Sequence, residues 1–150
     1  MTEQVPLKAP TKENLQVARS CLLDSFADVE ASIITLQAKL EIKATNATLG
    51  QRLDALRKIK ASPQLSKAKL AALHEFVARL AELNRLRGDV VHARMWVAPI
   101  AGEVRACFVN SLEAAEEFPS ARLLTLSQCE AVGRELREIA SRLTTWEPKG

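Results

Sequence analysis

An apolar stripe in the first third of the chain constrains the fold most strongly. Apolar side chains recur there at steps of three and four residues, which is the spacing of one face of an α-helix of about eight turns. A stripe of this length predicts a long partner helix, in the same chain or in a second copy. Thr11 can cap the helix at its start. The stripe consists of Leu15, Ala18, Leu22, Phe26, Val29, Ile33, Leu36 and Leu40.

Two further helices are predicted between residue 48 and about Arg87. Residues 48–51 can form a capping box, in which the Thr and Gln side chains cover free amides at the start of a short helix. Ser62-Pro63 predicts a stop and a restart, because Pro in the first helical position loses no needed hydrogen bond. The third helix is expected to run from Pro63 to about Arg87 and to end at Gly88.

The hydrophobic period changes after this helix. Two β-favouring runs, 95–99 and 104–109, predict a β-hairpin. Residues 113–120 are expected to form a loop, and Leu123-Leu124 could add a third short strand. We expect Trp96 to anchor the hairpin by packing. The alternative is an exposed indole that stacks on a nucleic-acid base.

A second capping box at 125–128 predicts the last helix, which ends before Pro148. The predicted fold is therefore mainly α: an up-and-down bundle of four helices, the first one long, with a β-hairpin inserted before the last helix. Residues 1–10 are expected to form a loose arm and residues 11–147 a single domain. Leu, Ala, Val and Ile must fill most of the core, because only 4% of the residues are aromatic.

Composition argues against several classes of function. The net charge of +3 is too small to imply nucleic-acid binding by itself. Cys21, Cys107 and Cys129 form no CxxC pair, and we expect reduced thiols packed as small hydrophobes. Two isolated histidines predict no metal site, and no cofactor is expected. No run approaches the roughly 20 apolar residues of a membrane span, so we expect a cytoplasmic protein.

One segment, 52–69, is locally basic, with six Lys or Arg against a single acid. It indicates either a solvated helix face or a patch that contacts phosphates. If the chain binds nucleic acid, the candidate contacts are Lys58, Lys60, Lys67, Arg85 and Arg94.

The segment most informative about chemistry is 87–92. It combines the guanidinium of Arg87, the carboxylate of Asp89 and the imidazole of His92, which could hold a phosphodiester and move protons near neutral pH. On an ideal helix Arg87 and His92 point about 140° apart. They can therefore converge only if the helix is distorted between them, or if a second copy meets the first across a two-fold axis.

Segment 83–96 (LNRLRGDVVHARMW) resembles the R-N-D-x-x-H-G-x-W segment of HEPN-like proteins. The predicted order of helices and hairpin fits the resemblance over most of the chain. It implies a helical bundle that dimerises with its R-x4–6-H motifs facing each other. Active members are metal-independent RNases of toxin–antitoxin and defence systems, whereas inactive members are binding modules.

The resemblance implies roles for three residues. Arg87 would hold the scissile phosphate, His92 would be the general acid or base, and Asp89 would orient one of them. The attacking group would be the 2′-hydroxyl of the RNA. Gly88 departs from the family, which has a polar residue, usually Asn, directly after the Arg.

Three hypotheses follow from the sequence. The first is a non-catalytic HEPN-like module, a homodimer that binds a partner protein in an interaction or regulatory role. Its interface would bury the stripe of the first helix or the motif helix. The second is an RNase that cleaves RNA through Arg87 and His92, in a shared cleft near the basic segment 52–69. The third is a helix-turn-helix DNA binder that uses the break at Ser62-Pro63.

Overall fold

The computed structural model describes residues 8–43, 47–110 and 121–148. It confirms the predicted fold class, with four helices and strands inserted before the last helix. The predicted loop 113–120 and residues 1–7 of the predicted arm lie outside the described residues. The elements are α1 (Lys12–Lys39), α2 (Leu49–Arg57), α3 (Lys67–Val91), β1 (Ala93–Ile100), β2 (Glu103–Asn110), β3 (Ala121–Thr125) and α4 (Leu126–Thr145).

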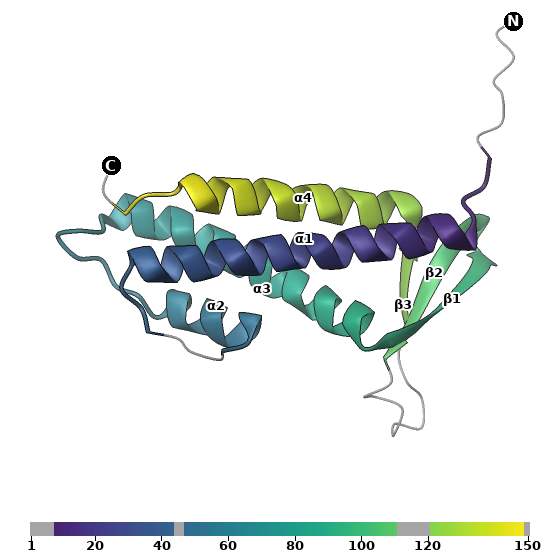
Figure 1. Ribbon diagram of the computed structural model, residues 1–150, viewed down its shortest axis with the longest axis horizontal. Helices are drawn as coiled ribbons and strands as arrows, with labels where there is room; N and C mark the ends of the chain where they lie inside the picture. The colour runs from purple at the N-terminus through teal and green to yellow at the C-terminus, as the bar shows by residue number, and fades with distance from the viewer. Residues whose placement is uncertain (1–7, 44–46, 111–120, 149–150) are drawn as a thin grey trace, which may run out of the picture.

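The partner of the long stripe is α4 of the same chain. Figure 1 shows α1 and α4 side by side, with α3 crossing behind α1 at an angle, α2 on the side of α1 away from α4, and the sheet across the end where α3 finishes. The stripe is buried from Leu15 to Leu36. A second copy is therefore not needed to cover it.

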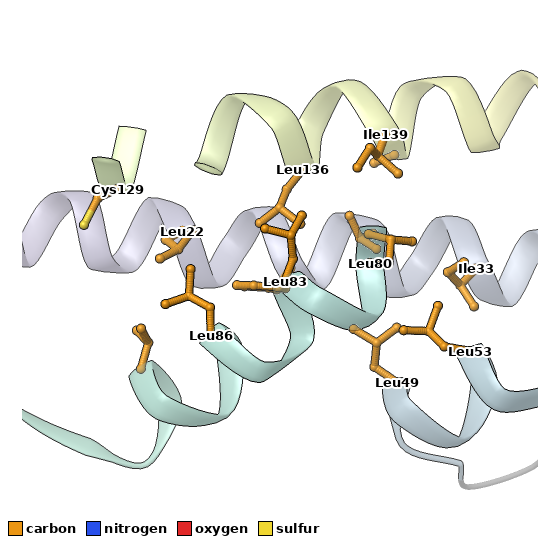
Figure 2. Close-up of a cluster of buried hydrophobic side chains, with 14 of the residues drawn as sticks. Leu22, Ile33, Leu49, Leu53, Leu80, Leu83, Leu86, Cys129, Leu136 and Ile139 are labelled. Carbon is orange, nitrogen blue, oxygen red and sulfur yellow. The ribbon is translucent and has the colours of Figure 1, made fainter. Parts of the chain in front are cut away.

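One apolar core runs through the molecule (Figure 2). All four helices contribute to it, and the sheet adds Ala106, Phe108 and Leu124. The sheet and the bundle therefore share one interior. The labelled helix residues in Figure 2 are Leu22, Ile33, Leu49, Leu53, Leu80, Leu83, Leu86, Cys129, Leu136 and Ile139.

The predicted helix starts are confirmed for α1, α2 and α4. At α2, Thr48 accepts a bond from the Gln51 amide at 3.3 Å, and the Gln51 side chain accepts one from the Thr48 amide at 2.9 Å. The same capping box begins α4. The start predicted for α3 is wrong, because the helix begins at Lys67. Pro63 lies instead in a turn closed by two backbone bonds between Ser62 and Leu65.

The predicted end of α3 is also wrong. The helix passes through Gly88 to Val91, and the amide of His92 still donates to the carbonyl of Gly88 at 3.4 Å. Gly88 does not adopt the left-handed conformation of a capping glycine. Tertiary packing holds this last turn, because Val90 is fully buried.

The three strands form an antiparallel sheet in the order β1-β2-β3. Both strands of the predicted hairpin are longer than expected, and the third strand is confirmed. Ala101 and Gly102 connect β1 to β2 with positive φ angles of 53° and 81°, as a type I′ turn requires.

The cysteines only partly fit the expectation of packed thiols. Cys129 is buried in the core, and burial raises the pKa of its thiol. Cys107 is half-buried on the sheet. Cys21 is exposed, because it lies on α1 outside the apolar stripe.

Candidate functional site at the end of α3

Arg87 and Asp89 lie in the last turns of α3, and His92 follows directly as its C-cap. Arg87 and Asp89 are half-buried and His92 is exposed. Because the helix continues through Gly88, the spacing of an ideal helix applies and turns Arg87 and His92 about 140° from each other. The distortion that would bring them together within one chain is not present.

Asp89 is held by a residue that sequence reasoning missed. Arg122 of β3 donates to the same carboxylate oxygen of Asp89 from Nη2 at 2.7 Å and from Nε at 3.1 Å. The carboxylate therefore ties α3 to the sheet. The expected role of Asp89, orienting Arg87 or His92, stays a prediction.

A second missed residue is Arg19 of α1. Its Nη2 donates to the carbonyls of Val90 and Ala93 at 2.8 and 3.0 Å, and its guanidinium lies over the ring of Phe108. Arg19 thus caps the carbonyl end of α3, where a cation also complements the helix dipole. Together with the Asp89–Arg122 pair, this cap fixes the direction in which the chain leaves α3.

Helical spacing groups His92 with Arg85 rather than with Arg87. Seven residues turn the helix by about 700°, which leaves Arg85 and His92 about 20° apart, and Asp89 lies between them. Both Arg85 and His92 are exposed. The surface at this end of α3, here called the motif face, therefore consists of Arg85, His92 and the Asp89–Arg122 pair.

The basic segment lies at the other end of α3. Lys58, Lys60 and Lys67 are exposed, as a solvated face predicts. Twenty residues of helix separate Lys67 from Arg87, or about 30 Å at 1.5 Å per residue. Within one chain, Lys67 therefore lies far from Arg87 and His92, and the expected proximity of the segment to a cleft shared by two copies stays a prediction.

Two of the basic side chains in segment 52–69 serve the fold. Arg52 is buried and donates to the side chain of Gln37 at 2.8 Å. Lys69 donates to the carbonyl of Glu147 and lies over the ring of Trp146. The segment thus offers less free positive charge than its composition indicates.

Trp96 does not anchor the hairpin, because 61% of its surface is exposed. It lies on the face of the sheet opposite to the core, as does Arg94. That expectation was wrong, and the alternative of an exposed indole fits the structure.

One surface groove lies away from the motif. A groove between α1 and α4 is lined by residues such as Val17, Cys21 and Arg134 and encloses about 440 Å³. Within the described ranges, no three His, Cys, Asp or Glu side chains gather as a metal ion would need. None of the described helices is long and apolar enough to cross a membrane.

No sequence signal could have pointed to Arg19 or Arg122, since each acts on a segment distant in the chain. Comparison of the chain with protein-family models, with curated proteins and with solved structures found no match.

Proposed function

We propose that the chain is a HEPN-like helical module that acts by binding, as a cytoplasmic homodimer in an interaction or regulatory role. The observation that carries the proposal is the continuous last turn of α3, which keeps Arg87 and His92 on different sides of the helix. One copy therefore lacks the paired cation and imidazole that phosphodiester cleavage needs.

Two further observations support binding over catalysis. Gly88 supplies no side chain where the family has a polar one. The carboxylate of Asp89 accepts two bonds from Arg122 and is thereby engaged with the sheet. A site without the polar side chain after the Arg, and with its carboxylate engaged by Arg122, has less to orient an attacking 2′-hydroxyl, whereas an exposed helix face can still bind.

The dimer would use the motif end of α3. The stripe of α1 is excluded as an interface, because α4 already covers it. On the motif face, Arg85 and His92 are exposed beside the half-exposed Asp89–Arg122 pair. Across a two-fold axis such a face meets its own copy, so the cations of one chain can approach the carboxylate of the other.

Sedimentation at micromolar concentration tests the proposal. We expect a dimer for the natural chain and a marked shift toward monomer for Arg85→Glu, since the new carboxylate would face Asp89 of the other copy. Lys67→Glu, an equal charge change at the far end of α3, is the control and should leave the dimer intact. A natural chain that sediments as a monomer overturns the proposal.

An RNase remains the second candidate, because His92 is exposed and a facing copy could supply Arg87. Incubating the purified chain with RNA separates the two functions, and we expect no cleavage by the natural chain. Cleavage that is lost in His92→Ala would establish the enzyme instead.

Gly88→Asn restores the side chain usual in the family without interrupting the helix. RNA cleavage gained by this variant would show that Gly88 is the reason why the natural chain does not cleave RNA.

A further inference from the structure

The outer face of the sheet carries a second candidate site, independent of the motif. Antiparallel pairing aligns Trp96, Cys107 and Leu123 in one row across the three strands. The core residues Ala106, Phe108 and Leu124 alternate with this row and point to the helices. The row of Trp96 therefore faces away from the bundle.

This row is more apolar than an outer sheet face needs to be. Among the described residues, the large hydrophobic side chains exposed to solvent are Val17, Ile34, Trp96 and Leu123. The last two share the row, at 61% and 38% exposure. With Cys107 between them, the exposed indole and the exposed leucine form an apolar surface that none of the described helices covers.

Positive charge flanks the indole along the strands. Arg94 lies two residues before Trp96 on β1, and Arg105 lies two residues from the partner of Trp96 on β2. Arg105 is partly buried, its Nε has no hydrogen-bond partner among the described residues, and its closest carboxylate, that of Glu103, is 3.9 Å away. Glu103 is the only acid on the described part of this face.

We infer that this face binds single-stranded nucleic acid, with a base stacked on Trp96 and phosphates held by Arg94 and Arg105. An aromatic ring on an open sheet between two guanidinium groups suits a ligand that alternates flat bases with negative charges. Leu123 extends the apolar surface beside the stacked base. This site needs neither the motif nor a dimer.

The size of the face also favours such a ligand over a protein. The three-stranded part spans roughly 15 Å by 17 Å, or about 250 Å², from strand spacing and rise. A stable protein interface needs about 800 Å² from each partner. A few stacked nucleotides fit the smaller area, as they do on other single-strand-binding sheets.

Fluorescence anisotropy with labelled single strands of about ten nucleotides, oligouridylate and oligothymidylate, tests the inference. We expect saturable binding and a Kd raised roughly 5- to 150-fold in Trp96→Ala, which is the range for losing one stacked base. Trp96→Phe keeps a ring and should recover most of the affinity. Arg94→Gln should reduce the dependence of log Kd on log salt by about 0.7.

Three controls test whether the oligonucleotide binds at the sheet. Lys58→Gln removes an exposed cation from the far end of the molecule and should change the Kd little. In Trp146→Phe the remaining fluorescence comes from Trp96, and its quenching by the oligonucleotide should follow the anisotropy. Circular dichroism should show Trp96→Ala folded, since the indole is exposed.

Two results would overturn the inference. One is the absence of binding by the natural chain, and the other is equal affinity in Trp96→Ala. A Trp96→Ala variant that loses the dimer while nucleic-acid binding stays unchanged would assign the face to a protein contact instead. Binding that persists in a monomeric Arg85→Glu variant would uphold this inference even if the proposed dimer fails.

Discussion

Gly88 sits inside α3 at a position where an added Cβ would meet no atom within 4 Å. Its backbone is helical, so the position does not need the left-handed conformation that favours glycine. Glycine therefore only adds conformational freedom to the unfolded chain, which is lost on folding. We expect Gly88→Ala to raise the free energy of unfolding by about 0.5 to 1 kcal/mol. Urea denaturation measures the change. A loss of stability would mean that the helix ends at Gly88 after all.

The same residue shows why the end of α3 was not predictable. A glycine before a change of hydrophobic period is the usual sign of a helix end. Here the helix continues past the glycine, and Arg19, which lies 71 residues before Val90 in the sequence, donates a hydrogen bond to the carbonyl of Val90. Local sequence carries the glycine signal, whereas the contact that overrides it depends on the tertiary fold.

Arg19 is expected to contribute more to stability than other arginines of the chain. It makes two charge-assisted bonds to carbonyls at the end of α3 and covers Phe108. We expect Arg19→Ala to lower the free energy of unfolding by about 2 to 3 kcal/mol. Arg142, exposed beside Glu138, is the matched control, and Arg142→Ala should cost about 0.5 kcal/mol or less. Equal losses in the two variants would contradict the capping role of Arg19.

Between elements, α3 and α4 are joined by the pair Arg79 and Glu135, with Nη2 and Oε2 2.7 Å apart. The bonds from Arg79 hold the pKa of the Glu135 carboxyl below its usual value. The pair therefore stabilises the fold above the pKa of a free Glu, about 4.3, and this contribution is lost as pH falls through the lower folded value.

We expect Glu135→Gln to cost about 1 kcal/mol or less at pH 7, because both side chains are partly exposed. The difference from the natural chain should shrink as pH falls from 7 to 3. Urea denaturation at both pH values measures it. Glu138→Gln, which removes the exposed partner of Arg142, should show little effect at either pH. A cost for Glu135→Gln that grows on acidification would contradict the assignment.

Elements were predictable where their signals are local. The capping boxes at Thr48 and Thr125 each lie within four residues, and the two strands of the hairpin are neighbours in the chain; the structure confirms both boxes and the hairpin. The orientation of β1 was not predictable. Both of its faces carry apolar residues, Met95 and Val97 on one and Trp96 and Ala98 on the other. Alternation alone therefore could not assign Trp96 to solvent.

At the scale of the whole molecule, the arrangement separates the candidate sites. The motif and the sheet lie at the end of α3, and Lys67 lies at its start. The order of the elements already predicted that the sheet follows the end of α3, whereas only the tertiary fold brings the start of α3 to the end of α4, where Lys69 donates to the carbonyl of Glu147. The basic segment and the motif therefore require separate functional arguments.

The shared core predicts that the two ends unfold together. Trp96 reports on the sheet, and Trp146 follows α4 at the opposite end, where Lys39 donates to its carbonyl at 3.1 Å. Trp146→Phe and Trp96→Phe each leave one reporter. We expect the same urea midpoint from both fluorescence signals and from circular dichroism, as a single cooperative unit requires.

Phe108→Ala sharpens this prediction, because Phe108 belongs to the sheet and is 1% exposed within the common core. Its loss should cost about 3 to 5 kcal/mol. If the core is one unit, the transition reported by Trp146 should shift as far as the one reported by Trp96, although Trp146 lies beyond the far end of α4. A shift confined to the Trp96 signal would show instead that the sheet unfolds on its own, and the packing of Phe108, Ala106 and Leu124 against the helices would then contribute little to the bundle.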